Sequence, residues 1–295
     1  MAYLVSVTAW NSNNLNFNAP FAGGATTTVT HPASALGSFS GDKVINGVTY
    51  SFAAQQRSVN SEVGYDWPAG NMAQVIGVGR TVDPSGTVLA GNVFGLGLTL
   101  GDQFTYGFSG FRYAGSGFGA AQISASTADD IGVFNQIMRF NDLVFLSGQN
   151  DSIATNAGKD LVFAGTGNDA VSGGAGNDLF NGEAGNDSLV GGSGNDLLFG
   201  GANADRFVFG NNDGTDRIKD FAIGDRIVIT DPTIRMANVT ISQSGAHSSV
   251  HFGNTTVIVE NIAPAFLTAA RFTFDGDAQV NTAVSGFFTN WDYFV

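Results

Sequence analysis

The chain contains no cysteine, so its fold has no disulfide bond to stabilise it. Basic residues are scarce: 12 lysine and arginine residues stand against 25 aspartate and glutamate residues, a formal net charge of −13. Because no basic cluster exists to meet phosphate groups, the composition argues against nucleic acid as a partner. No run of 18 apolar residues occurs, so we expect no transmembrane segment.

The sequence also lacks the short motifs that mark common enzyme sites. It contains no HExxH zinc-protease motif, no GxSxG nucleophile motif, no P-loop and no cysteine nucleophile. His247 and His251 lie four residues apart in HSSVH, on one face of an expected strand. They could ligate a metal, but no third ligand is in view, and the alternative is a surface or packing role. We therefore expect no enzyme.

The main feature of the sequence is a regular repeat of aspartate residues. Eight aspartates recur at a step of nine residues without a change of register: Asp142, Asp151, Asp160, Asp169, Asp178, Asp187, Asp196 and Asp205. Each unit has an apolar residue two places after its aspartate, among them Val162, Val171, Phe180, Leu189, Leu198 and Phe207. A unit this short cannot bury its apolar side chain alone, so the copies are expected to stack into a solenoid rather than form a disordered linker.

The carboxylates of this solenoid are expected to form two rows. Two nonapeptides make one turn of a two-sided coil, so aspartates eighteen residues apart align along one edge. Stacked strands lie about 4.8 Å apart, and ionised carboxylates at that spacing repel unless a cation lies between them. Calcium suits such rows because it takes 6–8 oxygen ligands, including main-chain carbonyls. We expect Ca²⁺ as the cofactor, in up to about six inter-turn sites that take the place of disulfides.

The repeats carry a family resemblance. The units AGTGNDAVS, GGAGNDLFN, GEAGNDSLV and GGSGNDLLF follow the pattern GGxGxDxUx, which resembles the RTX family of secreted bacterial calcium-binding proteins with a parallel β-roll. The resemblance covers roughly residues 142–230, including the closing segment 204–229. It implies that each six-residue turn binds calcium through its aspartate and main-chain oxygens.

The expected metal-site residues follow from that resemblance. They are Asp151, Asp160, Asp169, Asp178, Asp187, Asp196, Asp205, Gly158, Gly167, Gly173, Gly176, Gly182, Gly185, Gly191, Gly194 and Gly200. The flanking units depart from the pattern. The Asp142 unit has no glycine, and Gln149 and Asn203 stand where glycine is expected.

The resemblance also implies a route of export. The N-terminal apolar stretch is too short for a signal peptide and has no preceding Lys or Arg. RTX proteins leave through type I secretion, which reads an uncleaved C-terminal signal, and the segment from Asp292 to Val295 is similar to the acidic and hydrophobic end of such signals. We therefore expect a secreted protein, with the type I secretion machinery as a partner.

A pass along the chain predicts a mainly β protein in four parts. These are a β-rich N-terminal domain (1–125), a linking or capping helix (126–140), the parallel β-roll (141–219), and a β cap with the secretion signal (220–295). The helix is predicted from a capping residue, two early aspartates and one apolar face.

Three functions remain open for the N-terminal domain. The first is a non-enzymatic, surface-layer, matrix or adhesin-type structural protein with self-assembly or a cell-surface partner, which the many phenylalanines near glycines favour. The second is a ligand carrier, because region 35–125 faintly resembles secreted hemophores. On that alignment Val78 and Gly86 stand where the haem-binding Tyr and its supporting His belong, and only His31 is available as the loop ligand. The third is an enzyme whose site lies in residues 1–125.

Overall fold

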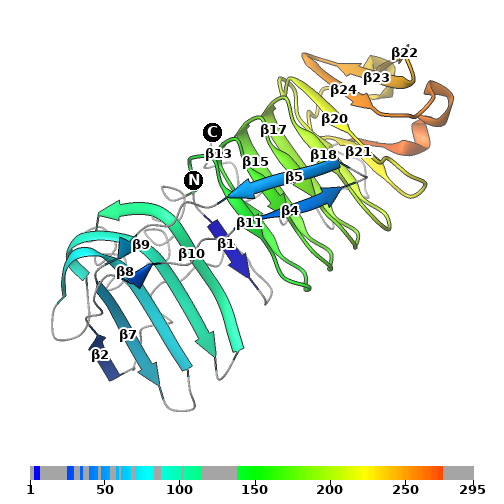
Figure 1. Ribbon diagram of the computed structural model, residues 1–295. Coiled ribbons are helices and arrows are strands. Elements are labelled where there is room, and N and C mark those ends of the chain that lie inside the picture. Colours follow the sequence, from blue (N-terminus) through cyan, green and yellow to red (C-terminus); the bar gives the residue numbers. More distant parts are fainter. Residues whose placement is uncertain are drawn as a thin grey trace. The chain divides into compact units, whose positions relative to one another are not determined.

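The computed structural model describes residues 138–274 throughout and, nearer the N-terminus, the backbone of ten strands between Tyr3 and Ala114 (Figure 1). The chain divides into two compact units, one of Met1–Thr8 and Asn14–Phe145, the other of Ala9–Asn13 and Leu146–Val295. The described part consists of strands, turns and three short 3₁₀ helices, which confirms a mainly β protein. The helix predicted over 126–140 falls mostly outside the described residues, and residues 138–140 form a turn and bends.

The first unit contains a sheet of antiparallel strands in the order β2-β7-β8-β9-β10-β1. Two smaller antiparallel pairs, β3 with β6 and β4 with β5, lie outside this sheet. Shifts of register mark irregular points between β8 and β9 and between β9 and β10, and bulges of this kind let long strands twist and bend. The strands are β1 (Tyr3–Ser6), β2 (Ala25–Val29), β3 (Ser34–Ala35), β4 (Ser40–Ile45), β5 (Val48–Ala53), β6 (Ser58–Val59), β7 (Ser61–Trp67), β8 (Asn71–Val82), β9 (Val88–Leu100) and β10 (Gln103–Ala114), with β11 (Leu143–Phe145) parallel to β1.

The second unit contains the roll, in which successive short strands alternate between two parallel sheets (Figure 1). One sheet consists of β14 (Leu161–Phe163), β16 (Leu179–Asn181), β18 (Leu197–Phe199), β20 (Thr215–Ile218) and β24 (Thr255–Val259). The other consists of β12 (Ser152–Ala154), β15 (Ala170–Gly176), β17 (Ser188–Gly194), β19 (Arg206–Phe209), β21 (Arg226–Ile229) and β25 (Phe272–Phe274), with β13 (Ala157–Gly158) beside β15. Val162 pairs with Phe180 and Val171 with Leu189, at the predicted eighteen-residue offset. The parallel β-roll is therefore confirmed.

The interior of the roll is filled by the apolar residues that follow each aspartate by two places. All six predicted positions are 0% exposed: Val162, Val171, Phe180, Leu189, Leu198 and Phe207. Because the strands are parallel and in register, equivalent side chains stack from turn to turn along the roll. Each fully buried side chain of this size contributes roughly 1.5–3 kcal/mol of hydrophobic stabilisation.

Parallel pairing extends beyond residue 219, where the sequence suggested that the roll ends. It continues through β21 and β25 in one sheet and through β24 in the other. An antiparallel hairpin then closes the end, as β22 (Thr240–Ser244) pairs with β23 (His247–Phe252) and β23 with β24. The 3₁₀ helices are η3 (Met236–Asn238), η4 (Pro264–Phe266) and η5 (Ala269–Arg271).

Aromatic side chains cover the last turn. The ring of Phe221 lies 6.0 Å from that of Phe207, and Phe266 meets Phe221 edge-on at 6.5 Å between centroids. Phe221 is only 4% exposed. The apolar end of the roll is thus shielded from water, as the terminal repeat of a solenoid requires.

Candidate metal centre

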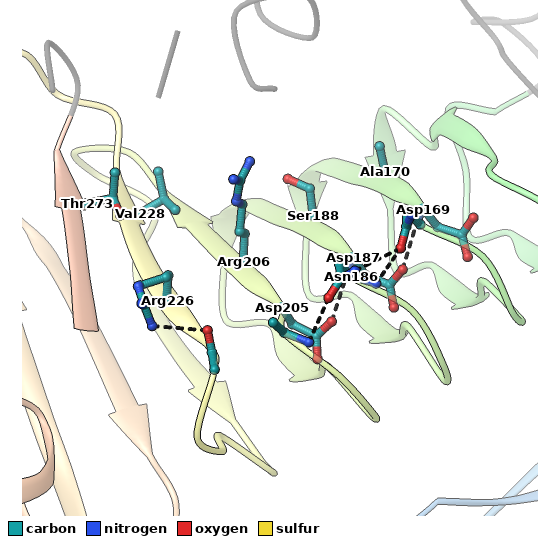
Figure 2. Close-up of a pocket in the computed structure, with 13 residues that line it drawn as sticks. Asp169, Ala170, Asn186, Asp187, Ser188, Asp205, Arg206, Arg226, Val228 and Thr273 are labelled. Atoms are coloured by element: carbon teal, nitrogen blue, oxygen red, sulfur yellow. Dashed lines mark hydrogen bonds between the residues drawn. The ribbon is translucent and has the colours of Figure 1, made fainter. Parts of the chain in front are cut away.

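The aspartates form two hydrogen-bonded ladders along the edges of the roll. In each ladder the Oδ1 atom of one aspartate accepts the backbone N–H of the aspartate one turn earlier. On one edge the donor and acceptor pairs are Asp151 with Asp169, Asp169 with Asp187, Asp187 with Asp205 and Asp205 with Asp225, at 2.8–3.0 Å. Figure 2 shows the two bonds that join Asp169, Asp187 and Asp205. On the other edge they are Asp160 with Asp178, Asp178 with Asp196 and Asp196 with Asp216, at 2.8–2.9 Å. The predicted rows of carboxylates therefore exist in the structure.

The second carboxylate oxygen, Oδ2, takes no part in the ladder, and in most of the ladder aspartates it accepts no other hydrogen bond. The Oδ2 atom is buried and has no hydrogen-bond partner in Asp169, Asp178, Asp187, Asp196, Asp205 and Asp216. Each of these residues is at most 2% exposed. A buried acceptor without a donor costs about 1–3 kcal/mol, and a buried charge costs more unless an opposite charge pairs with it. Two rows of such oxygens require a cation or a proton at each step.

Burial has a direct effect on ionisation. It raises the pKa to about 7 for Asp169, Asp187, Asp196 and Asp205, to about 6 for Asp178 and to about 8 for Asp216. The N–H from the preceding turn lowers each pKa in part. A carboxyl with a raised folded-state pKa adds stability that is fully present below its ordinary pKa of 3.8 and is lost as the pH rises through about 7. Without a cation, the folded roll is therefore expected to be more stable at acid pH than at neutral pH.

The glycines of each six-residue loop allow the turns to approach closely. At the fourth loop position Gly158, Gly167, Gly176, Gly185 and Gly194 all have positive φ. A Cβ at Gly176 would collide with the carbonyl oxygen of Gly158 one turn earlier. Asn203, which replaces glycine at this position, keeps the positive φ. The loop conformation thus continues through the Asp205 unit.

The glycine at the first position of each of these loops leaves room for the carboxylate of the aspartate that ends the loop. A Cβ at Gly173, Gly182, Gly191 or Gly200 would collide with the Oδ2 atom of the aspartate that ends the same loop. For Gly182 the carbonyl oxygen of Gly200 in the next turn lies nearly as close to that Cβ position. A carboxylate oxygen and a main-chain carbonyl oxygen of the next turn therefore lie close to the same point between two turns.

These oxygens fit a hard cation. Within residues 138–274, no group of three or more His, Cys, Asp or Glu residues converges as a metal-binding set. A metal in the roll would therefore take the unpartnered carboxylate oxygens of successive turns and complete its shell with main-chain oxygens. Calcium accepts such mixtures, with 6–8 oxygen ligands at 2.3–2.6 Å.

Asp151 differs from the aspartates that follow it. Its Oδ2 atom accepts the backbone N–H of Ser147 at 2.9 Å and the Ser147 hydroxyl at 2.7 Å. Gln149, at the fourth position of this loop, is not among the residues with positive φ. The first loop is thus closed by its own serine and does not repeat the conformation of the later loops.

Two ladder residues were missed in the sequence because they break the period. Asp216 and Asp225 follow Asp196 and Asp205 by 20 residues instead of 18. Asp216 follows Asp205 by eleven residues instead of nine. The strand β19 has four residues where β14, β16 and β18 have three, and Gly210 is a second extra residue between β19 and the next loop. The signal that marks them is Asp-Arg-Ile, which occurs at Asp216 and again nine residues later at Asp225.

Asparagines beside the aspartates form further ladders. The Oδ1 atom of Asn150 accepts the N–H of Asn168, and that of Asn168 accepts the N–H of Asn186, both at 2.8 Å. On the other edge Asn177 accepts the N–H of Asn195 at 2.9 Å. These bonds run in the opposite direction to the aspartate ladders and use no charge, so they join the turns with or without a metal.

His247 and His251 each form a hydrogen bond with a nearby residue. The Nδ1 atom of His247 accepts the N–H of Asn261 at 3.0 Å, and the Nδ1 atom of His251 lies 3.1 Å from the hydroxyl of Thr256. Each ring therefore uses one nitrogen in a local contact at the surface of the cap, which favours a surface or packing role over metal ligation.

The fold and the carboxylate rows define a calcium-type parallel β-roll. Residues 145–216 match the family model of the RTX calcium-binding nonapeptide repeat, over 145–180, 172–207 and 181–216. The predicted RTX resemblance is therefore confirmed for these residues. The resemblance of region 35–125 to hemophores is not tested and stays a prediction.

A search of solved structures finds chains that are similar to this one. One is the extracellular lipase LipA from Serratia marcescens, with 16% identity and a TM-score of 0.26 over 45% of this chain and 38% of the lipase. Another is the AlgE6R3 subunit of the Azotobacter vinelandii mannuronan C5-epimerase, with 22% identity and a TM-score of 0.31 over 50% of this chain and 83% of that one. The match thus spans well under half of the lipase. A comparison with curated proteins gives no significant match, and no helix within the described residues is long and apolar enough to cross a membrane.

Proposed function

We propose that this chain is an extracellular calcium-binding RTX protein without catalytic activity, which is exported by type I secretion, folds on calcium and serves as a surface-layer, matrix or adhesin-type structural protein. The observation that carries the proposal is the two rows of buried carboxylate oxygens without hydrogen-bond donors. Calcium between successive turns would supply the missing partner and neutralise much of the formal charge of −13.

The proposed ions lie between aspartates one turn apart, in up to about six positions. The strongest candidates are the pairs Asp169–Asp187 and Asp187–Asp205 on one edge and Asp178–Asp196 on the other, because each member has a free Oδ2 atom. The pair Asp151–Asp169 is expected to bind more weakly, because Ser147 already donates twice to Asp151.

A structural role for the first unit rests on its strands and composition. Its long antiparallel strands β8, β9 and β10 carry several phenylalanines, including Phe94 and Phe108, and few charges. Catalytic motifs are absent from the sequence. Such a sheet suits contact with further copies of the chain or with another surface.

Assembly is the direct test of this role. Full-length protein is expected to form ordered filaments or sheets in millimolar calcium, and separate particles in EDTA, when viewed by negative-stain electron microscopy. A haemin titration followed by visible absorbance is the control, and we expect no saturable complex. Separate particles in calcium together with a stoichiometric haemin complex would favour the ligand carrier instead.

Export can be tested at the C-terminus. Deletion of Asn290 to Val295 is expected to leave calcium binding by the purified protein unchanged and to abolish its appearance in the medium of a host with a matching type I exporter. Sites of extracellular grade bind calcium at about 10⁻⁴–10⁻³ M, so the repeats would remain unfolded inside the cell. Normal secretion of the truncated chain would contradict the assigned route.

A further inference from the structure

A groove of about 600 Å³ crosses the outer face of one sheet of the roll. It is lined by residues from five neighbouring strands, β15, β17, β19, β21 and β25. These side chains point outward, because side chains alternate along a strand and the next residues, such as Leu189 and Phe207, are 0% exposed in the core. At about 4.8 Å per strand, this outer groove is roughly 19 Å long. In strand order its lining includes Ala170, Ser188, Arg206, Val228 and Thr273 (Figure 2).

Arg206 brings a positive charge without a partner into the outer groove. Within residues 138–274 its guanidinium makes no hydrogen bond, ion pair or ring contact. By contrast, the guanidinium of Arg217 pairs with Glu260 at 3.1 Å. That of Arg226 donates to the carbonyl of Gly224 at 3.0 Å. Because a guanidinium has five N–H donors, Arg206 is able to bind an anionic group.

A second arginine lies opposite Arg206 on the next strand. Arg226 is its register partner across β19 and β21. Like charges directly opposite each other on neighbouring strands are destabilising. Figure 2 shows the two side chains diverging: Arg226 turns toward the carbonyl of Gly224, and Arg206 extends away from Asp205. An anionic group beside Arg206 would offset this repulsion.

The aspartates beside the outer groove would not supply that anionic group in the calcium form. Asp169, Asp187 and Asp205 also line the groove, but each is at most 2% exposed and belongs to a ladder. With calcium bound as proposed above, the ions offset their negative charge. The two arginines then set the sign of the charge in the groove. An anionic partner is therefore expected to bind when calcium is present.

The segment that follows the last strand of the groove has the matching charge. Residues 275–295 contain no Lys or Arg and begin two residues after Thr273, which lines the groove. An Asp-Gly pair at the start of the segment favours a turn, which would direct the chain back over the sheet. About six extended residues, at roughly 3.3 Å each, span the groove, so these 21 residues reach all of it. The acidic residues of the segment are Asp275, Asp277 and Asp292.

The outer face beside Arg206 is a covered surface. Val208 and Val228 are register partners on this face, and they are only 1% and 2% exposed. The compact unit that contains the roll includes residues 275–295, which have five aromatic side chains to pack on these valines. That unit also includes Ala9–Asn13, which has no charged residue and so offers no carboxylate to Arg206. Charge complementarity therefore favours the later segment.

We propose that residues 275–295 dock in the outer groove after calcium has folded the roll, with an aspartate of the segment paired to Arg206. The inference rests on the proposed calcium binding and adds an intramolecular partner for a face that the ions do not occupy. For export, this means that the segment that the secretion machinery would read in the unfolded chain becomes part of the folded protein outside the cell.

A spin label on the segment measures docking directly. The chain has no cysteine, so Asn290→Cys in the full-length protein carries the only nitroxide. Its electron paramagnetic resonance spectrum is expected to be mainly immobilised in millimolar calcium and mainly mobile in EDTA. Arg206→Glu should make the calcium spectrum mainly mobile, while the calcium stoichiometry from isothermal titration stays unchanged. The roll should tolerate this substitution, because the new carboxylate lies opposite Arg226.

Two further variants make the test specific. Arg217→Glu is the matched control, because Arg217 lies on β20 of the other sheet, and its spectrum in calcium should stay immobilised. Asp277→Lys combined with Asp292→Lys reverses the net charge of the segment. This double variant is expected to release the label in calcium as Arg206→Glu does.

The possible results separate docking from calcium binding. A mobile label on the calcium-loaded chain with Arg206 intact overturns docking and leaves calcium binding by the repeats standing. An immobilised label in Arg206→Glu or in the double lysine variant also overturns it, as does equal release by Arg217→Glu. Immobilisation that disappears on dilution would place the segment in the groove of a second copy, against the proposal. A chain that binds no calcium would instead refute the proposed function itself.

Discussion

Removing calcium from the full-length chain is expected to unfold the roll. Without the ion, buried carboxylates of successive turns lie next to one another within each row, and the glycine-rich loops have a large conformational entropy to lose on ordering. With the ion, its binding free energy becomes folding free energy. Far-ultraviolet circular dichroism should show β structure in millimolar calcium and a large loss of that signal in EDTA, and hydrogen exchange should place the change in residues 152–229.

The pH dependence of folding in EDTA and of calcium affinity provides an independent test of the same account. Burial raises the pKa of Asp187 to about 7 and that of Asp178 to about 6, so a proton can replace the ion in acid. In EDTA, β structure in the roll is expected to increase as the pH falls from about 8 toward 4. Calcium affinity should change in the opposite sense and weaken in acid, because protons and calcium compete for the same oxygens. Magnesium is the matched control ion, since it demands a smaller octahedral shell. Identical spectra with calcium and with EDTA at pH 8 would contradict this account.

Substitution of Gly176 by alanine is expected to be among the most destabilising additions of a single methyl group to the roll. Gly176 has φ +150°, and an added Cβ would overlap the carbonyl oxygen of Gly158 in the preceding turn. The strained backbone alone costs about 1–3 kcal/mol, and the overlap forces two turns apart. We therefore expect a loss of about 3 kcal/mol or more in the free energy of unfolding. Urea denaturation in saturating calcium measures it.

Gly245 offers the matched control for that substitution. It also has positive φ, at +63°, but an added Cβ would find nothing within 4 Å. Asparagine tolerates this conformation, so Gly245→Asn is expected to change the free energy of unfolding by no more than about 0.5 kcal/mol. Equal unfolding midpoints for the two variants would show that the close approach of turns at Gly176 is not required.

Much of the roll could be predicted because its period is local. An apolar residue two places after each aspartate, repeated every nine residues, predicts both the buried position of Phe180 and its partner Val162 one turn earlier. The same arithmetic aligns Asp178 with Asp196. These predictions hold because each repeat forms half a turn of the roll. Residues eighteen positions apart in the sequence therefore lie beside each other in adjacent turns.

The period fails between Asp205 and Asp216, which are eleven residues apart instead of nine. Asp216 and Asp225 stand in the ladders at a 20-residue step, and a search at a fixed step of nine cannot find them. The fourth residue of β19, Phe209, pairs with Ile229 of β21, and this pairing is a property of the packed sheet. The contacts of Asn254 and Thr255 with the loop at 211–216 are equally out of reach, because they join residues more than 40 positions apart.

The sequence by itself determined that the carboxylates lie in two rows beside a stacked apolar core, because a fixed repeat imposes the same geometry on every turn. Only the tertiary structure decided which oxygens in those rows remain for a metal. Asp151 and Asp225 have ladder positions equivalent to that of Asp187, yet Ser147 and Ala222 donate to their second oxygens, and Asp187 has no such donor. A carboxylate needs a cation only where no N–H or O–H lies within about 3 Å of it, and that depends on how neighbouring segments fold against it.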